Sequence, residues 1–453
     1  SHHKGSLYFS SEVRAFQTID AINAENENWP VYFMAYGHLP EPVTTLQHVK
    51  PLSKGCYLRF DVLSQTSEIH SFGQLRYLEK LDRKEEVLSA IRESLQQAIQ
   101  RHLLSDAPIG AFLSGGIDSS LIALMAGAEA NEKLTTLSIY FDEELYSEKQ
   151  YQDLVSSKLT GNHRAFCLRE EEFTQCFPAI IDAMDMPSND GINTWFISKY
   201  AKEAGLKAVL SGLGGDELFG GYPSFDRLKT TAYLQQLPRT SLRAGRYSRS
   251  KKIKRLAYLS LPGAKGKYLF LRGQFVPSEI ASQLGIAEEQ VWRLLDEQPQ
   301  VPDIHHMTAK NQASWMEMNL YMQNQLLRDS DVMSMAHGIE IRVPFLDLDF
   351  VKLALQIESS VKYAGGGKRL LVEAFEDILP PPVYNRSKMG FSFPFKLWLA
   401  NNAWVNDQLH NAPGDTKKTY AGFLKGQRHW SQVLSLLLIQ QHGVSKKAAV
   451  SYA

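Results

Sequence analysis

A short run of glycine, serine and aspartate residues near position 115 has the composition of a phosphate-binding loop. It consists of Ser114, Gly115, Gly116, Ile117, Asp118, Ser119 and Ser120. Glycine lets the backbone approach an anion closely, and the N-terminus of a following helix offers free N–H groups and a favourable dipole. The run lacks the Lys-Ser/Thr ending that grips the β- and γ-phosphates in P-loop proteins. Its Asp118 indicates instead a Mg²⁺ ion held beside pyrophosphate. Taken alone, the run could also be a glycine turn that binds nothing.

A second glycine-rich turn, at residues 211–222, supplies another carboxylate. It directly follows the apolar run at 207–210 and contains Asp216. Because Mg²⁺ is held by carboxylate oxygens, Asp216 can be a second metal ligand opposite Asp118. Two further segments follow in the sequence: a polar–apolar run at 334–347 that ends in a Pro turn, and a basic pair of segments at 368–371 and 386–391.

The elements that position these residues alternate between strand and helix. Short apolar runs at 108–113, 134–141 and 207–210 predict strands, and the first and last of them end in glycines. The apolar segment 118–130 predicts a helix. Strand, glycine turn and helix in series indicate a parallel sheet with helices on both faces. Beyond Tyr222 the pattern predicts mostly helix, to about residue 441.

The part of the chain before this alternation has a different pattern. Residues 1 to about 75 are predicted as strands and turns, with β-prone runs at 7–9 and 56–60. A helix should begin after Leu81, with Asp82 and Glu85 forming a capping box. Apolar residues then recur at helical spacing, and they are Val87, Ile91, Leu95 and Ile99. The domain boundary is therefore expected at about residue 78.

The overall composition excludes several classes of function. The chain has 453 residues, which favours two domains, and 49 basic residues balance 49 acidic ones. No global field draws it to nucleic acid or to an anionic membrane. Three cysteines without a C-x-x-C motif fit a reducing compartment, and no apolar run is long enough to span a bilayer. These features predict a cytoplasmic enzyme. A basic run at 239–255 is interpreted as a solvated helix or loop rather than an anion site.

All four motif segments, in this order, resemble the synthetase domain of the glutamine-dependent asparagine synthetase family and the related β-lactam-forming synthetases. The resemblance runs from about residue 82 to about residue 400. It implies an α/β fold: an ATP-pyrophosphatase (PP-loop, Rossmann-like) domain with a parallel sheet and a helical C-terminal part, over residues 79–441, followed by a tail at 442–453. Residues 1–78 are similar to the last portion of the family's α+β glutaminase (Ntn-hydrolase) domain. That domain uses an N-terminal Cys nucleophile, which would precede this chain, so glutamine hydrolysis is not expected of it.

The same resemblance implies a reaction and a set of site residues. ATP and Mg²⁺ would bind so that a carboxylate attacks the α-phosphate and pyrophosphate leaves, after which ammonia from glutamine or another amine attacks the acyl-adenylate. Asp118 and Asp216 would be the metal ligands, and Lys388 would lie at the reacting centre. The expected ATP-binding residues are Ser114, Gly115, Gly116, Asp118, Ser119, Ser120, Ser138, Gly212, Gly214 and Gly215. The expected partners are small molecules, without nucleic acid or membrane, and a homodimer is left open.

One position departs from the family pattern. Asparagine synthetases carry an acid where this chain has Leu213, and leucine can neither take a proton nor hold an ammonium ion. Either the acceptor or the amine therefore differs from aspartate and ammonia, or Glu340 serves as the base. The alternative for Glu340 is an ion pair with Arg342, and the sequence leaves both open.

Three classes of function fit these residues. The first is an amidotransferase that makes a carboxamide, either asparagine or a uronamide or natural-product amide. The second is a ligase for an amine other than ammonia, as in β-lactam or lasso-peptide ring closure. The third is a non-catalytic binding subunit, against which the intact loop, both aspartates and Lys388 argue.

Overall fold

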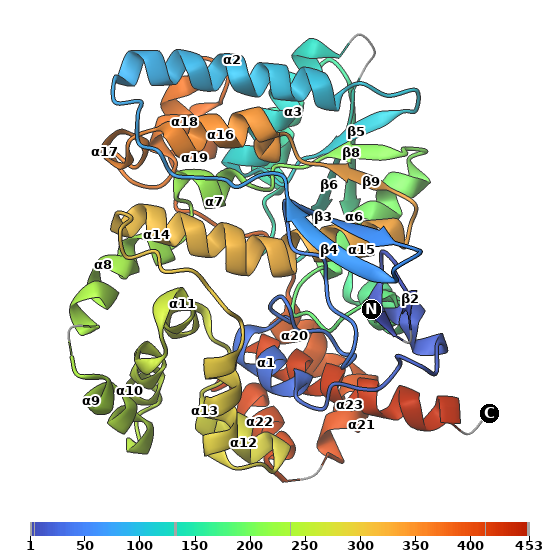
Figure 1. Ribbon diagram of the computed structural model, residues 1–453. Coiled ribbons are helices and arrows are strands. Elements are labelled where there is room, and N and C mark those ends of the chain that lie inside the picture. The colour runs from blue at the N-terminus through green and yellow to red at the C-terminus, as the bar shows by residue number, and fades with distance from the viewer. Residues whose placement is uncertain (1, 4, 131–133, 236, 413, 451–453) are drawn as a thin grey trace.

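A five-stranded parallel sheet lies in the upper half of the molecule, on the right in Figure 1. The computed structural model describes residues 2–3, 5–130, 134–235, 237–412 and 414–450. The strand order is β7-β6-β5-β8-β9. The strands are β5 (Ile109–Phe112), β6 (Thr135–Tyr140), β7 (Asn162–Cys167), β8 (Ala208–Leu210) and β9 (Glu340–Arg342). The parallel sheet expected from the alternating pattern is confirmed, and β7 and β9 are additional strands.

Helices cover both faces of this sheet because its strands are apolar on both sides. Successive strand side chains point to opposite faces. Ala111 of β5 packs with apolar residues of α2 (Lys84–His102) and α3 (Ile117–Glu129), whereas Phe112 faces a second cluster with α6 (Ile192–Glu203). The sheet therefore has the layered arrangement of an α/β fold.

The two glycine-rich loops meet because the strands before them are neighbours. β5 pairs in parallel with β8, with Ala111 opposite Leu210. In a parallel pair both carboxyl ends lie at the same edge, so the loops that follow the two strands lie side by side. This edge is the place where ligands bind in open α/β sheets.

The remainder of the chain is largely helical, and in Figure 1 its helices lie both beside the sheet and below it. Helices on the sheet side are α4 (Lys149–Ser156), α5 (Glu170–Ala183), α7 (Gly215–Phe219), α14 (Ala309–Met316), the π-helical η4 (Glu317–Leu326), α15 (Leu327–Met335), α16 (Leu348–Gln356), α17 (Ser359–Lys362), α18 (Arg369–Ala374) and α19 (Pro381–Tyr384). The others are α8 (Ser224–Leu234), α9 (Arg239–Ala244), α10 (Lys251–Leu256), α11 (Gly263–Arg272), α12 (Pro277–Leu284), α13 (Glu288–Glu297), α20 (Phe395–Asn401), α21 (Ala403–His410), α22 (Gly414–Leu424) and α23 (Trp430–Val450). The predicted tail begins inside α23, which reaches Val450.

The region before α2 contains a helix that the sequence pattern did not predict. α1 (Trp29–Tyr36) is buried among α11, α12, α13 and α23. Its residues are apolar all round, so no amphipathic stripe marks it as a helix. The predicted strand at 56–60 is present as β3 (Cys56–Asp61), which pairs with β4 (Thr66–Ser71), and a smaller ribbon joins β1 (His2–His3) to β2 (Ser6–Leu7). The glutaminase assignment of residues 1–78 rests on the sequence resemblance alone.

The helix predicted after Leu81 is α2, and its buried face is the expected one. Val87, Ile91, Leu95 and Ile99 are all buried. The predicted capping box is wrong, since the residue before the helix is Arg83 and no side chain caps the helix N-terminus.

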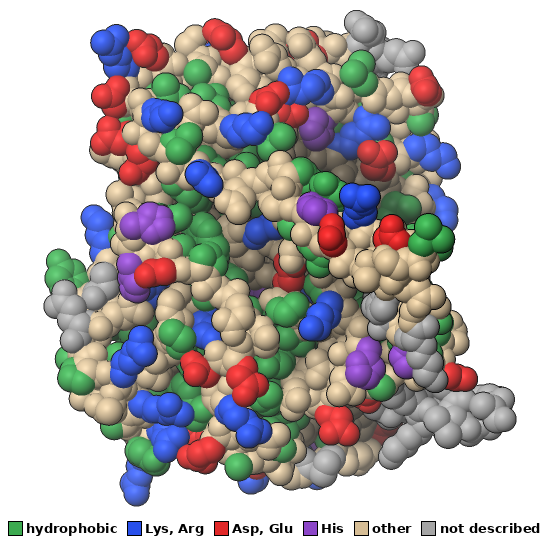
Figure 2. Space-filling view, in the orientation of Figure 1, with side chains coloured by type: hydrophobic (Ala, Val, Ile, Leu, Met, Phe, Trp, Pro, Cys, Tyr) green, Lys and Arg blue, Asp and Glu red, His purple; other side chains and the backbone are tan. Residues whose placement is uncertain are grey.

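The surface carries charges of both signs. On the face shown in Figure 2, acidic and basic side chains are interspersed over the upper and lower halves of the molecule. Several members of the basic run at 239–255 have partners within the protein: Arg246 pairs with Glu289 at 3.2 Å and Lys251 pairs with Glu279 at 3.4 Å. Within the described residues, no helix combines the length and the apolar character that crossing a bilayer requires.

Candidate active site

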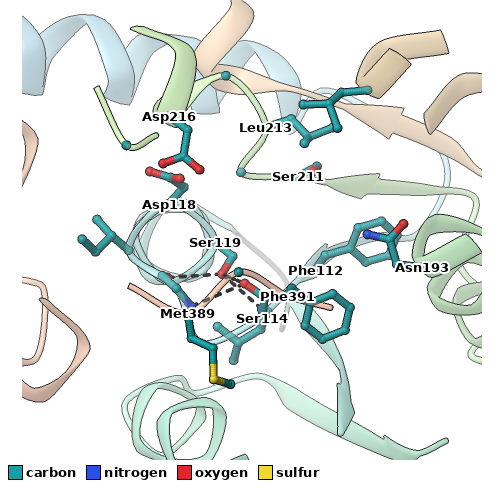
Figure 3. Close-up of a pocket in the computed structure, with 18 of the residues that line it drawn as sticks. Phe112, Ser114, Asp118, Ser119, Asn193, Ser211, Leu213, Asp216, Met389 and Phe391 are labelled. Atoms are coloured by element: carbon teal, nitrogen blue, oxygen red, sulfur yellow. Dashed lines mark hydrogen bonds between the residues drawn. The ribbon is translucent and has the colours of Figure 1, made fainter. Parts of the chain in front are cut away.

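A cavity of about 540 Å³ opens at the carboxyl edge of β5 and β8. Its walls come from the loop before α3, the turn before α7, the helices α6 and α15, and the segment 383–391. Figure 3 shows Asp118 and Asp216 facing each other across this space, with Ser114 and Ser119 below them and Leu213 on the opposite side. The structure thus brings together residues from all of the sequence motifs.

The first loop is closed by its own serines. The hydroxyl oxygens of Ser114 and Ser119 are 2.8 Å apart, and the Ser114 amide donates to the Ser119 hydroxyl at 3.1 Å. Gly115 has a φ of +87°, which favours glycine. The loop therefore turns tightly into α3 and leaves the N-terminus of that helix at the cavity, where its N–H groups can face an anion.

An arginine outside the loop fixes its position. Arg386 donates to the carbonyl oxygen of Gly115 at 2.9 Å and to Glu148 at 2.5 Å, and its guanidinium lies over the ring of Tyr151. Both charged partners are largely buried, so the ion pair is shielded from water. Arg386 lies in a segment that the sequence singled out, but its positioning role was not predicted.

The second turn reaches the first loop because glycine leaves room for it. A side chain at Gly212 would place its Cβ 2.7 Å from the amide nitrogen of Ser119. Gly214 has a φ of +101° and precedes α7. Close backbone approach at Gly212 and the turn at Gly214 set Asp216 opposite Asp118.

The two aspartates share a buried lysine. The Lys368 ammonium forms an ion pair with Asp118 and with Asp216, and only 6% of its side chain is exposed. Lys388 adds a second cation, 2.8 Å from the other oxygen of Asp216, and it also donates to the carbonyl oxygen of Gly221 at 2.9 Å. Lys388 is 43% exposed, so it lies at the mouth of the arrangement rather than within it.

Burial and charge act in opposite directions on this group. Burial raises the pKa of Asp118 above its ordinary value, with a contribution from the neighbouring Asp216, although Lys368 acts to lower it. Burial also acts to raise the pKa of Asp216, but Lys368 and Lys388 together bring it below its ordinary value. Burial disfavours the charged form of Lys368, yet the two carboxylates outweigh this and raise its pKa. Lys368 is therefore a fixed positive charge.

The aspartates are suited to a metal that also binds phosphate. One buried oxygen of Asp118 has no hydrogen-bond partner among the described residues. No cluster of three or more His, Cys, Asp or Glu side chains that could hold a metal occurs within the described ranges. A two-carboxylate site fits Mg²⁺, which is bound by one or two carboxylates together with phosphate oxygens and water.

Five predicted site residues do not line the cavity, and they are Gly115, Ser120, Ser138, Gly215 and Glu340. Gly115 and Gly215 shape the two loops: Gly115 has a positive φ, and a side chain at Gly215 would meet the carboxylate of Asp118. Ser120 is fully buried and Ser138 donates its hydroxyl to the carbonyl oxygen of Leu113 at 2.6 Å, so both lie within the fold rather than in the cavity wall. Glu340 starts β9, at the edge of the sheet opposite to the cavity. Its carboxylate is 62% exposed and pairs with Arg342 at 3.0 Å. The structure thus gives Glu340 the ion-pair arrangement, and we do not include it in the proposed site.

Lys368, like Arg386, is a site residue to which the sequence pattern assigned no role. It belongs to a segment that was noted for its order, but no role was assigned to it. Its signal was local: Lys368 follows three glycines at 365–367 and has a φ of +64°. Residues other than glycine seldom adopt that conformation, and such strain is found at functional sites.

A nucleotide-binding α/β domain is the class of protein that this sheet, these glycine loops and these opposed carboxylates define. The family model for asparagine synthase matches residues 90–434. The chain therefore belongs to the asparagine synthase family.

The chain is similar to several curated relatives. It is 28% identical to asparagine synthetase [glutamine-hydrolyzing] 1 of Bacillus subtilis over 90% of this chain and 66% of that protein. It is 26% identical to asparagine synthetase B [glutamine-hydrolyzing] of Escherichia coli over 77% of this chain and 52% of that protein. Amidase chry2 of Gibberella zeae is 22% identical over 87% of this chain and 65% of that protein. The chain thus spans between about half and about two thirds of the length of these relatives.

Proposed function

We propose that this protein is an ATP-dependent ligase that activates a carboxylate as an acyl-adenylate and converts it to an amide. The observation that carries the proposal is the pair of opposed carboxylates, Asp118 and Asp216, neutralised by Lys368 beside a serine–glycine loop at a helix N-terminus. The loop lacks the lysine that P-loop proteins use for β- and γ-phosphates. Membership of the asparagine synthase family supports the same reaction class.

In the first half-reaction the carboxylate of the acceptor attacks the α-phosphate of ATP and pyrophosphate leaves. The amides at the start of α3 and the hydroxyls of Ser114 and Ser119 would hold the departing phosphates. Asp118 and Asp216 would hold Mg²⁺, which would supply positive charge to the phosphate oxygens when bound. Lys368 keeps the two carboxylates from repelling each other. Positioning and charge neutralisation supply the rate in this step.

In the second half-reaction an amine attacks the acyl carbon and AMP leaves. Lys388 would stabilise the negative charge that develops on the reacting atoms. Its ammonium supports this role, because it lies at the cavity wall and is held by Asp216 and the Gly221 carbonyl. Leu213 lines the same cavity. This apolar side chain favours an acceptor or amine different from aspartate and ammonia, with a uronic acid or a ring-forming substrate as the alternatives.

Carboxylate-dependent exchange between pyrophosphate and ATP tests the proposal directly. The wild-type chain should catalyse this exchange with one or more members of a panel that includes aspartate, uronic acids and amino-carboxylates, and should form AMP rather than ADP. Asp118→Asn should lose most of this exchange. Asp331→Asn is the matched control and should keep it. Asp331 is an exposed aspartate on α15 that does not line the cavity. Formation of ADP as the main product, or the absence of exchange with every carboxylate, would overturn the proposal.

A further inference from the structure

The cavity holds a second pair of carboxyl groups on its α6 and α15 side. Asp190 lies just before α6 and Asp329 lies in α15, and both line the cavity. Gly191 brings the two segments together: it has a φ of +89°, and a Cβ there would lie 3.1 Å from the Cβ of Asp329. This packing places two acidic side chains at one end of a space that the proposed function assigns to substrates.

These two carboxyl groups form no ion pair among the described residues. Asp329 is 8% exposed and accepts a hydrogen bond from the Ser188 hydroxyl at 2.5 Å. Asp190 accepts one from the amide of Gly191 at 2.8 Å. Each therefore uses one oxygen for the fold and leaves the other without a hydrogen bond in the described part of the chain. An unpaired carboxylate in such a place is costly unless a partner arrives.

Uncharged polar side chains in the same cavity also lack partners. Ser330 is 7% exposed and Ser211 is 9% exposed, and both line the cavity. Within the described ranges neither hydroxyl has a hydrogen bond, although both side chains are more than nine-tenths buried. Figure 3 shows Ser211 beside Leu213 and facing the same space as Asn193. Buried polar groups without partners point to a ligand that supplies them.

Among the described residues, the nearest cations form no ion pair with either aspartate, although the charge of Arg328 acts on Asp329. Arg272 pairs with the buried Glu317 at 2.8 Å and lies over the ring of Tyr321. Arg328 donates to the carbonyl oxygen of Leu39 at 3.3 Å. The charges of Arg272 and Arg328 offset only part of the effect of burial on the two aspartates. Burial raises the pKa of Asp329 to about 8, with Asp190 adding to the rise, and it also raises the pKa of Asp190. The acidic end of the cavity therefore holds two carboxyl groups and, in the described part of the chain, no cation in direct contact with either of them.

We propose that Asp190 and Asp329 form the subsite that binds the amine substrate in its protonated, positively charged form. An ammonium group would supply a positive charge and could donate hydrogen bonds to Asp190, to the ionised form of Asp329 and to the hydroxyl of Ser330. Transfer of one ammonium proton to Asp329 would then leave the neutral amine that attacks the acyl carbon. The assignment rests on the proposed function, since it concerns the amine of the same reaction. It also explains how an apolar residue can occupy position 213, because the acidic residues that would bind the amine lie on α15 and just before α6.

The experiment compares two nitrogen nucleophiles with the carboxylate that supports exchange. Ammonium is a cation near neutral pH, whereas hydroxylamine is uncharged there and traps an acyl-adenylate as a hydroxamate. In Asp329→Asn and in Asp190→Asn, kcat/KM for ammonium should fall by about 10- to 100-fold relative to kcat/KM for hydroxylamine, the usual range for a charged hydrogen bond. Asp331→Asn, on the same helix, should leave this ratio unchanged. A ratio within about threefold of wild type in both cavity variants, or a loss confined to KM for the carboxylate, would overturn the assignment.

A binding measurement separates this inference from the proposed function. Methylammonium chloride should raise the melting temperature of the wild-type protein above that in potassium chloride of equal ionic strength, and the rise should vanish in Asp329→Asn. If Asp329→Asn does not fold, Asp190→Asn and Ser330→Ala take its place. Equal stabilisation of wild type and variants would contradict the subsite. Failure of carboxylate-dependent exchange in the wild type would instead contradict the proposed ligase activity and leave the methylammonium result to decide the subsite.

Discussion

Two pairs of aspartates line one cavity, and they differ in how their charge is balanced. Asp118 and Asp216 share the ammonium of Lys368, which is 6% exposed. Asp190 and Asp329 have hydrogen bonds to neighbouring groups of the fold but no cation of their own. Carboxylates that must stay ionised to hold a metal gain from a permanent counter-charge. Carboxylates that recognise a substrate cation gain specificity when that charge is left for the substrate to supply.

The first pair should show the largest effect on activity. Asp118→Asn and Asp216→Asn are each expected to lower carboxylate-dependent AMP formation by about 10²- to 10³-fold, because each removes a proposed ligand of the Mg²⁺ ion that would neutralise the phosphates. The double variant should be little worse than either single one, as for residues that act as a unit. Nucleotide products analysed at saturating ATP measure this, with Asp331→Asn as the matched control. Near-normal activity of either single variant at limiting Mg²⁺ would remove that residue from the metal site.

The two lysines of the first pair should differ in their effect on stability. Lys368→Met leaves two buried carboxylates without their counter-charge, so the free energy of unfolding should fall by about 3–5 kcal/mol. Lys388→Met removes a cation that is 43% exposed, and the fall should stay below about 1 kcal/mol. Chemical denaturation of both variants measures the difference. Equal losses would mean that Lys368 is not what balances the pair.

The second pair should make stability depend on pH. Burial raises the pKa of Asp329 from 3.8 to about 8, so the folded protein keeps a proton that the unfolded chain has released. The stability that this proton contributes is fully present below about pH 4 and is lost, by about 1 kcal/mol per pH unit, as the pH rises towards about 8. The difference in unfolding free energy between Asp329→Asn and wild type should shift in favour of the variant over this window. A pH-independent difference would show that Asp329 is ionised throughout.

The smallest effect is expected at Glu340, which belongs to neither pair of aspartates and lies outside the cavity. Its carboxylate is 62% exposed and pairs with Arg342, so Glu340→Gln should change the unfolding free energy by less than about 1 kcal/mol. Amide formation and pyrophosphate exchange, assayed side by side, should both stay near the wild-type rates. Selective slowing of amide formation would restore Glu340 as a base.

The sequence by itself determined the elements whose signals are local. The loop at 114–120, the turn at 211–222 and the buried face of α2 could all be read from glycine spacing and apolar periodicity over a few residues. The opposition of Asp118 and Asp216 followed from one further step, because the strands before them were predicted to lie parallel in one sheet. These predictions needed only short-range patterns and a general rule of sheet topology.

Only the tertiary structure decided the rest, because it depends on contacts between distant segments. Lys368 reaches Asp118 across 250 positions of sequence, and no pattern around either residue encodes that meeting. The same holds for Asp190 and Asp329, whose approach depends on the positive φ of Gly191 and on the packing of α15 against α6. Glu340 shows the converse: it lies in a run that resembles a site motif, yet its strand enters the sheet with that end turned away from the cavity. Charge compensation is a property of side chains from several elements, so it emerges only when packing brings those elements together.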